Sequence, residues 1–353
     1  MKKTINHKLK IATITFIWLG ISACSKEEVH LNALNETIFV RHKNADMPAR
    51  IYGNGSEKVF LIILHGGPGG SGLQYRVNAI RTEIEKNNAV VYFDQRGSGS
   101  SQGNYAEKDV SIDIMAEDVL ALAQVIKTKY GDDAKLFLMG HSWGGALGPA
   151  TLLKNQSVFA GWINVDGSHD PKGLYDTYKV VLPKMAHEQI ALGNSVDYWQ
   201  GVLDLVQNTG PYSLENYYTL NGTANGVAKI LAADKVVNEP KADFGNDTPS
   251  ENASIVTWNT NKIGRILDEK GLNENISYTD RLAEIRIPSI VLWGAYDVVV
   301  PTLYAQEAFD NLGACDKEIF IFEKSAHSPM YTEPDLFAEK VIEFINTSRV
   351  CDF

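Results

Sequence analysis

The sequence is poor in cysteine and lacks the patterns that bind metal ions. Only three of its 353 residues are cysteines, and they lie far apart, at positions 24, 315 and 351. A structural zinc site needs a cluster of cysteines and histidines, and the His-Glu-x-x-His pattern of many catalytic zinc sites is also missing. No internal repeat recurs along the chain, which excludes a solenoid or a propeller. We therefore expect no metal site.

Basic residues are also in short supply. The chain has 33 lysines and arginines against 43 acidic residues, a formal net charge of -10. An acidic surface repels phosphate backbones, and no basic stripe alternates with aromatic residues, so nucleic acid is excluded as a partner. The glycine-rich stretch at residues 66–70 is not closed by Gly-Lys-Ser/Thr and lacks Rossmann spacing. We therefore expect no cofactor.

The N-terminal apolar run, Ile11–Ile21, is shorter than the ~20 residues of a membrane-spanning helix. Four lysines precede it and small residues follow it, which is the pattern of a secretory signal. The end of the run, up to Cys24, resembles a bacterial lipobox. That resemblance implies removal of residues 1–23 and a lipid on Cys24, which would make the protein an exported, membrane-anchored lipoprotein. The alternative is an ordinary cleaved signal with an incidental cysteine.

Residues 24–34 are interpreted as a tether. Residues 25–28, Ser-Lys-Glu-Glu, resemble the lysine-and-acid tag of some bacterial lipoproteins that reach the cell surface, although a solvated tether would have a similar composition. The anchor could thus face the periplasm or the outside. In an exported protein Cys315 and Cys351 either pair or stay as free thiols. A bridge between them would tie the C-terminal tail to the loop before the last strand, worth about 3–4 kcal/mol.

Short apolar runs alternate with helical patterns through much of the chain. Such runs are typical of strands buried on both faces, and their alternation with helices predicts an α/β fold with a mostly parallel sheet. Two short antiparallel strands are expected within residues 31–52, and the clearest helix spans Ser111–Tyr130. The expected buried strands are Val59–Leu64, Ala89–Phe93, Leu136–Met139, Gly161–Val165, Ile290–Trp293 and Ile319–Phe322, and further helices are expected at Ala146–Leu153 and Leu336–Ile345.

The alternation breaks between the fourth and fifth of these strands. That segment contains aromatic-rich and polar stretches but no short buried strand. We interpret residues 168–282 as a largely helical insertion over the sheet, called the cap from here on. The hydrolase core would then consist of residues 35–167 and 283–353.

Residues 140–144, Gly-His-Ser-Trp-Gly, directly follow a predicted strand and precede a predicted helix. This spacing is that of a nucleophile elbow, a sharp turn that exposes a serine hydroxyl at a helix N-terminus. The alternative is a glycine-rich turn with a chance serine. The strand and helix on either side favour the elbow, so Ser142 is the candidate nucleophile.

A serine nucleophile needs a base, which is nearly always a histidine. In this fold the expected order along the chain is serine, acid, histidine. Of the eight histidines, only three follow Ser142, and His327 is the one that comes after the last predicted strand. Asp297, just after the strand Ile290–Trp293, is the candidate acid that orients it. Asp166, at the end of Gly161–Val165, is the alternative acid.

The oxyanion of an acyl-transfer intermediate needs backbone donors. The glycine-rich stretch at residues 66–70 allows amides to point into a site, so the amides of Gly67 and Trp143 are the candidate oxyanion hole. Asp94 and Arg96, after the second buried strand, are interpreted as a structural pair that holds the neighbouring loops.

Three motifs together resemble the proline iminopeptidase family of α/β hydrolases. They are His-Gly-Gly-Pro-Gly at 65–69, Asp-Gln-Arg-Gly-Ser-Gly at 94–99 and Gly-His-Ser-Trp-Gly-Gly at 140–145. The likeness covers about residues 55–167 and 284–345. It implies the triad Ser142, Asp297 and His327, an acyl-enzyme mechanism, no cofactor, and release of N-terminal residues, typically proline, from small peptides.

The cap departs from that family. Its peptidases hold the substrate's ammonium with cap carboxylates, commonly in a Trp-Glu context, and this sequence has no Trp-Glu. Glu188, Glu215 and Glu251 are available acids in the cap, and for each of them a solvated surface position is the alternative to a role as substrate anchor. Two other functions therefore stay open: an esterase, lactonase or amidase acting on a small acyl substrate, and a non-catalytic surface binding protein.

Overall fold

A nine-stranded sheet forms the centre of the chain, which the computed structural model describes over residues 31–349. The strands lie in the order β1-β2-β4-β3-β6-β7-β8-β9, and the short β5 pairs with β2. β2 runs antiparallel to both of its long neighbours, whereas every pair from β4 to β9 is parallel. The strands are β1 (Leu34–His42), β2 (Ala45–Gly53), β3 (Val59–Leu64), β4 (Ala89–Phe93), β5 (Gln102–Gly103), β6 (Lys135–His141), β7 (Gly161–Val165), β8 (Ser289–Gly294) and β9 (Lys317–Phe322).

The predicted α/β hydrolase fold with a mostly parallel sheet is confirmed. The central strands are mostly apolar, as expected for strands whose two faces are both covered by helices. On β3, Ile62 and Leu64 belong to one buried cluster, while Leu61 and Ile63 belong to the other. This division follows from the two-residue period of a strand, which sends successive side chains to opposite faces.

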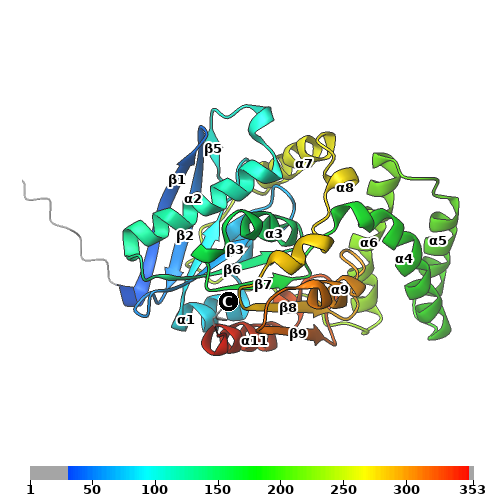
Figure 1. Cartoon of the computed structure of the whole chain (residues 1–353). Helices are drawn as coiled ribbons and strands as arrows, with labels where there is room; N and C mark the ends of the chain where they lie inside the picture. The colour runs from blue at the N-terminus through cyan, green and yellow to red at the C-terminus, as the bar shows by residue number, and fades with distance from the viewer. Residues whose placement is uncertain (1–30, 350–353) are drawn as a thin grey trace, which may run out of the picture. The chain divides into compact units, whose positions relative to one another are not determined.

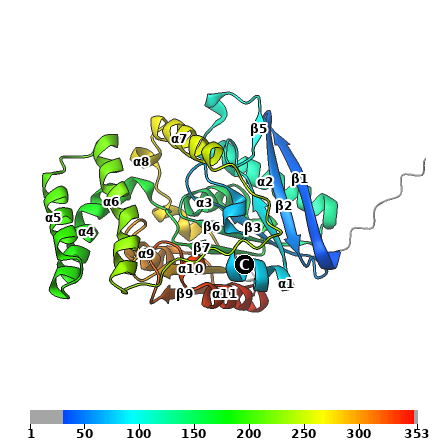
Figure 2. The same ribbon diagram turned by 180° about the vertical axis from the view of Figure 1, so that it is seen from behind.

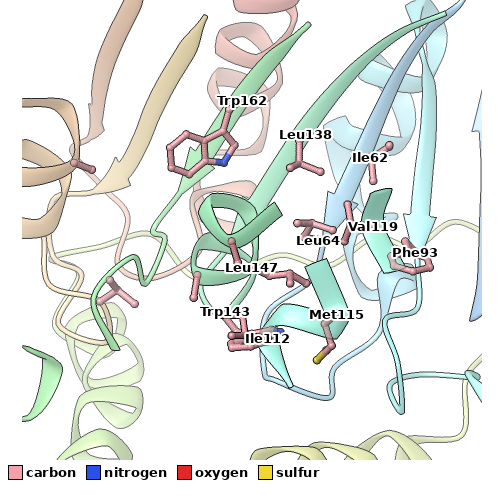
Figure 3. Packing of buried hydrophobic residues seen from close by; sticks show 14 of the residues in the cluster. Ile62, Leu64, Phe93, Ile112, Met115, Val119, Leu138, Trp143, Leu147 and Trp162 are labelled. Atoms are coloured by element: carbon pink, nitrogen blue, oxygen red, sulfur yellow. The ribbon is translucent and has the colours of Figure 1, made fainter. Parts of the chain in front are cut away.

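Helices α2 and α3 cover one face of the sheet, and α11 covers the other (Figures 1 and 2). Figure 3 shows part of the first layer, in which Met115 and Val119 of α2 and Leu147 of α3 belong to the same buried cluster as Leu138 and Ile62 of the strands. The core helices are α1 (Glu85–Asn87), α2 (Ile112–Tyr130), α3 (Gly144–Asn155), α9 (Leu303–Asn311), α10 (Pro329–Thr332) and α11 (Pro334–Thr347).

The segment between β7 and β8 is helical, as predicted for the cap. Figures 1 and 2 show α4, α5 and α6 grouped in green beside the sheet, on the side away from β1. The cap helices are α4 (Leu174–Ala191), α5 (Val196–Asn208), α6 (Leu214–Ala233), α7 (Ala253–Glu269) and α8 (Leu272–Asn275).

A long irregular segment, residues 234–252, joins α6 to α7 and is fastened to the core. The backbone N–H of Lys241 donates to the carbonyl of Tyr331, and the N–H of Asn78 donates to the carbonyl of Asp243. Further along, the guanidinium of Arg76 binds the Asp247 carboxylate at 2.7 Å. These contacts hold the segment between α6 and α7 against the core loops.

The predicted pair between Asp94 and Arg96 is wrong. Arg96 is fully buried and forms two hydrogen bonds, of 2.6 and 2.8 Å, with Asp118 of α2. Asp94 instead binds Arg50 at 3.0 Å and accepts hydrogen bonds from the backbone N–H groups of two loops. The two side chains diverge because each meets an oppositely charged partner on a different element. Arg96 and Asp94 thus hold loops independently, each through its own partner.

Some predictions fall on residues that the structure does not describe. The signal, the lipidation site Cys24 and the tether up to residue 30 lie outside the described range, as does Cys351. Cys315 is disulfide-bonded. Within residues 31–349, none of the helices combines the length and the apolar character that crossing a bilayer requires.

Candidate active site

Ser142 lies in the turn between β6 and α3, where strand and helix approach very closely. A methyl group on Gly140 would come within 2.3 Å of the Gly144 carbonyl oxygen, and one on Gly144 within 2.1 Å of the Leu64 carbonyl oxygen. Only glycine fits at either position. Ser142 itself has φ +56°, in the left-handed region that non-glycine residues rarely adopt. The fold therefore holds this one serine in a strained conformation, typical of functional positions.

His327 reaches Ser142 from the loop after β9. Its Nε2 lies 2.9 Å from the Ser142 Oγ, and its Nδ1 lies 2.8 Å from Asp297 Oδ2. Because a carboxylate only accepts hydrogen bonds, the ring proton is on Nδ1, which leaves the lone pair of Nε2 to accept the serine hydroxyl. The structure thus brings together all three side chains that the sequence singled out.

Asp297 is fully enclosed and firmly oriented. Its Oδ1 accepts hydrogen bonds from the backbone N–H groups of Val299, at 2.8 Å, and Val300, at 3.1 Å. These two donors leave Oδ2 to face the imidazole. The side chain of Asp297 is 0 % exposed and that of His327 14 %, so the pair is shielded from water while the ring still reaches the cavity.

Asp166, the alternative acid, lies close by but does not bind the imidazole. Its Oδ1 accepts the backbone N–H of Gly294 at 2.9 Å. Burial, together with the neighbouring Asp297, raises the pKa of the Asp166 carboxyl well above its usual range. Two adjacent buried carboxyls cannot both ionise cheaply, and Asp297 has the imidazole to stabilise its charge. The geometry therefore favours Asp297 as the acid and leaves Asp166 as its protonated neighbour.

The amides of Gly67 and Trp143 both border the cavity at Ser142. Neither N–H donates to another protein group within the described part of the chain. The loop that carries Gly67 also lies close to the serine. A methyl group added to Gly66 would be only 3.2 Å from Ser142 Cβ. Two backbone donors without a protein acceptor therefore border the cavity that contains the serine hydroxyl, which is compatible with an oxyanion hole.

His141, Asp166 and His327 lie close enough together to suggest a metal site, with one potential ligand atom from each within 4.8 Å of the others. Their bonding does not fit that role. His141 uses one ring nitrogen toward Tyr75 and the other toward the His327 carbonyl. His327 uses both of its nitrogens within the triad. Neither histidine thus has a free ring nitrogen, and we assign no metal to the cluster.

The site opens into a cavity of about 870 Å³ between the core and the cap. The core contributes the serine, the histidine and the glycine-rich loop. The cap contributes aromatic, amide, apolar and acidic side chains and the basic side chain of Arg265, so its wall is mixed in polarity. The cap residues of this wall include Leu174, Tyr178, Leu214, Tyr217, Tyr218, Asn221, Asn225, Asp268 and Leu272.

Asp268, near the end of α7, is an acidic group in this cavity that the sequence did not reveal. It is 7 % exposed and accepts hydrogen bonds from Tyr218 and from Asn273, both neutral. Arg265, one turn earlier, binds Glu269 and Glu107 instead. Burial raises the pKa of the Asp268 carboxyl to about 6. At neutral pH the cavity therefore contains a buried negative charge with no ion-pair partner among the described residues.

The three cap acids singled out from the sequence do not border this cavity. Glu188 and Glu215 are exposed. Glu251 is half-buried, accepts a hydrogen bond from the Ser71 hydroxyl and has a pKa raised by burial. No local pattern in the sequence marks Asp268, because its hydrogen-bond donors, Tyr218 and Asn273, lie on other helices of the cap.

Comparison with known proteins supports the same fold. Residues 59–210 match the family model described as the alpha/beta hydrolase fold. A proline iminopeptidase of Clostridioides difficile is 27% identical, over 85% of this chain and 94% of its own length. One of Saccharolobus solfataricus is 28% identical, over 81% and 84% respectively. The crystal structure of a proline iminopeptidase-related protein of Thermus thermophilus superimposes with a TM-score of 0.59 at 22% identity, covering 89% of this chain and 98% of that one.

The two candidate acids can be separated by substitution. In Asp297→Asn the amide can donate to Nδ1, which moves the ring proton to Nε2 and removes the lone pair that faces Ser142. We expect labelling by a fluorophosphonate probe to slow about 10⁴-fold. Asp166→Asn keeps an oxygen for the Gly294 N–H and should slow labelling less than tenfold. Equal effects of both changes, in proteins with equal melting temperatures, would contradict the assignment of Asp297.

Proposed function

Because the chain is an α/β hydrolase that resembles the proline iminopeptidases, we propose that it is a serine aminopeptidase acting on small peptides. The observation that carries the proposal is the line of contacts from Ser142 Oγ through the His327 imidazole to Asp297, with distances of 2.9 and 2.8 Å. A serine, a histidine and an aspartate in this order form the machinery of acyl transfer.

In the first step, Ser142 Oγ attacks the carbonyl carbon of the substrate's N-terminal residue. His327 Nε2 takes the hydroxyl proton as the new C–O bond forms, and Asp297 stabilises the resulting imidazolium. The carbonyl oxygen becomes an oxyanion, for which the amides of Gly67 and Trp143 are the available donors. Each such donor is worth about 10²–10³-fold in rate.

The intermediate then collapses. The C–N bond breaks, and the imidazolium of His327 gives its proton to the leaving amine, which departs as the shortened peptide. The N-terminal residue stays on Ser142 as an ester. A water molecule, deprotonated by the same imidazole, attacks this ester, and return of the proton to Ser142 Oγ releases the free amino acid.

Asp268 supports an amine-bearing substrate. An aminopeptidase must recognise the ammonium group of the residue that it removes, and a buried carboxylate with only neutral donors is a suitable partner. The pairing would give the Asp268 charge the cation that its neighbours do not provide. Asp268 and Ser142 both border the same cavity.

A small-acyl esterase is the second candidate. Leu174, Leu214 and Leu272 of the cap border the same cavity, and apolar side chains favour uncharged acyl groups. Such an enzyme would use the same triad on an ester without needing Asp268. The two candidates therefore differ in one measurable property, the preference for a free amine.

A panel of substrates tests the proposal. The purified mature chain should hydrolyse proline and other aminoacyl arylamides faster than their N-acetylated forms. Ser142→Ala should lower turnover about 10⁴–10⁶-fold, since members of a triad act as a unit. Hydrolysis of short p-nitrophenyl esters without any arylamide activity would replace the aminopeptidase by the esterase. Equal probe labelling of wild type and Ser142→Ala would show that the nucleophile is misassigned, whereas a wild type that is not labelled at all would favour the binding protein.

The role of Asp268 is tested by Asp268→Asn. Loss of a charge-assisted contact worth about 1.5–3 kcal/mol should lower kcat/KM for aminoacyl arylamides about 10–100-fold and leave neutral esters unchanged. The Asp268 carboxyl is ionised above its pKa of about 6. The advantage of wild type over the variant should therefore shrink as the pH falls through 6. Glu215→Gln, which removes an exposed cap acid, is the matched control, and a parallel loss on esters would contradict the role.

We also propose that the chain is exported and anchored through lipid on Cys24. The support is the sequence pattern alone, a basic head, a short apolar run and a lipobox-like ending. Multiple acyl chains give a stable anchor. In a bacterial host fed a labelled fatty acid, the wild type should carry the label in the membrane fraction, and Cys24→Ser should lose it. An unlabelled wild type cleaved at another position would show an ordinary signal instead.

A further inference from the structure

His141, the residue before the nucleophile, connects three parts of the site. Its Nδ1 lies 2.6 Å from the Tyr75 hydroxyl, and its Nε2 lies 2.8 Å from the backbone carbonyl oxygen of His327. The Tyr75 hydroxyl also accepts the backbone N–H of Gly66 at 2.8 Å. One chain of hydrogen bonds thus runs from the glycine-rich loop, through the elbow, to the loop that carries His327.

The direction of each hydrogen bond in this chain is determined. A carbonyl oxygen only accepts, so His141 Nε2 carries the proton. Burial, assisted by the nearby His327, lowers the pKa of His141 to about 3, which keeps the ring neutral and leaves Nδ1 as an acceptor. The Tyr75 hydroxyl, whose pKa is raised by burial, gives its single proton to Nδ1. Its oxygen then accepts from Gly66.

We propose that Tyr75 and His141 are positioning residues that hold the glycine-rich loop and the His327 loop in register with Ser142. The proposal rests on the serine-hydrolase function proposed above. It requires of residue 141 a neutral side chain that donates on one side and accepts on the other. Histidine in its Nε2–H form meets that requirement.

Two further contacts show why the position of these loops relative to Ser142 matters for the rate. The rings of His141 and His327 lie against each other, with centroids 4.9 Å apart. A methyl group on Gly66 would lie 3.2 Å from the Tyr75 hydroxyl and 3.3 Å from His141 Nδ1, so the loop fits closely around this pair. A shift of about 1 Å in the His327 ring would cost about 10²-fold in rate. The His141 ring therefore restrains both the backbone and the ring of His327.

A neutral ring at position 141 also suits the reaction. His327 becomes an imidazolium during acyl transfer, and a second positive charge 4.9 Å away would oppose that step. Since both nitrogens of His141 already bond within the protein, it has no free group to offer a substrate. These points make His141 a positioning residue and not a catalytic one.

The test compares His141→Gln with His141→Leu. The amide of glutamine can donate to the His327 carbonyl and accept from Tyr75, whereas leucine fills the space without either bond. We expect Gln to keep kcat within about fivefold of wild type, and Leu to lose about 10–100-fold in kcat with little change in KM. If His141 acted only by packing, the order of the two kcat values would be reversed, because an apolar leucine would fit the buried site better than a polar glutamine. Leu matching or exceeding Gln would overturn the proposal.

Tyr75→Phe tests the other half of the chain. It removes the acceptor for the Gly66 N–H and the donor to His141, and should lower kcat about tenfold. Tyr130→Phe, which removes a hydrogen bond to Glu36 from a buried tyrosine away from the site, is the matched control and should not change kcat. A Tyr75→Phe variant as active as Tyr130→Phe would overturn the role of Tyr75.

Probe labelling separates this proposal from the proposed function. The rate at which a fluorophosphonate labels Ser142 depends on the serine and histidine but on no particular substrate. If the wild type is not labelled, the serine-hydrolase function itself fails. If the wild type is labelled and His141→Leu is labelled at the same rate, with an equal melting temperature, only the positioning role fails.

Discussion

The proposed activity depends on one contact, the 2.9 Å between Ser142 Oγ and His327 Nε2. The two residues are 185 positions apart in the chain, and each is held from its own side. Glycines at positions 140 and 144 allow the close turn that gives Ser142 its φ of +56°. Asp297, fixed by two backbone N–H groups, orients the imidazole. Neither constraint would suffice without the other.

The sheet provides the rigid frame for this contact. Its central strands are parallel, so the loops that carry Ser142, Asp297 and His327 all leave from the same edge. Helices cover both faces, and the central strands β3, β4, β6, β7 and β8 are buried except at Val59 and Lys135. This burial gives the frame the packing energy that offsets a strained turn. The Tyr75–His141 chain of hydrogen bonds then links the loops directly, above the strands that position them.

In the proposed function the core carries the catalytic triad, and the cap residues that border the cavity select the substrate. Its wall combines leucines, tyrosines and asparagines with one buried carboxylate, Asp268, whose hydrogen-bond donors are neutral. Burial without a cation is costly for a carboxylate, and the raised pKa of Asp268 reflects that cost. A ligand that supplies a positive charge would relieve it. The segment between α6 and α7 is fastened to the core at Arg76.

The sequence by itself determined the fold class, the strands and the serine turn, because periodicity and glycine spacing are local properties of the chain. The order of the motifs selected His327 and left two acids, Asp297 and the alternative Asp166, of which the structure brings Asp297 to the imidazole. Only the tertiary structure decided that Arg96 pairs with Asp118 and not with Asp94, that Asp268 faces the cavity, and that His141 bridges two loops. Those partners lie on separate elements, and their meeting depends on how helices and loops pack, which no local pattern records.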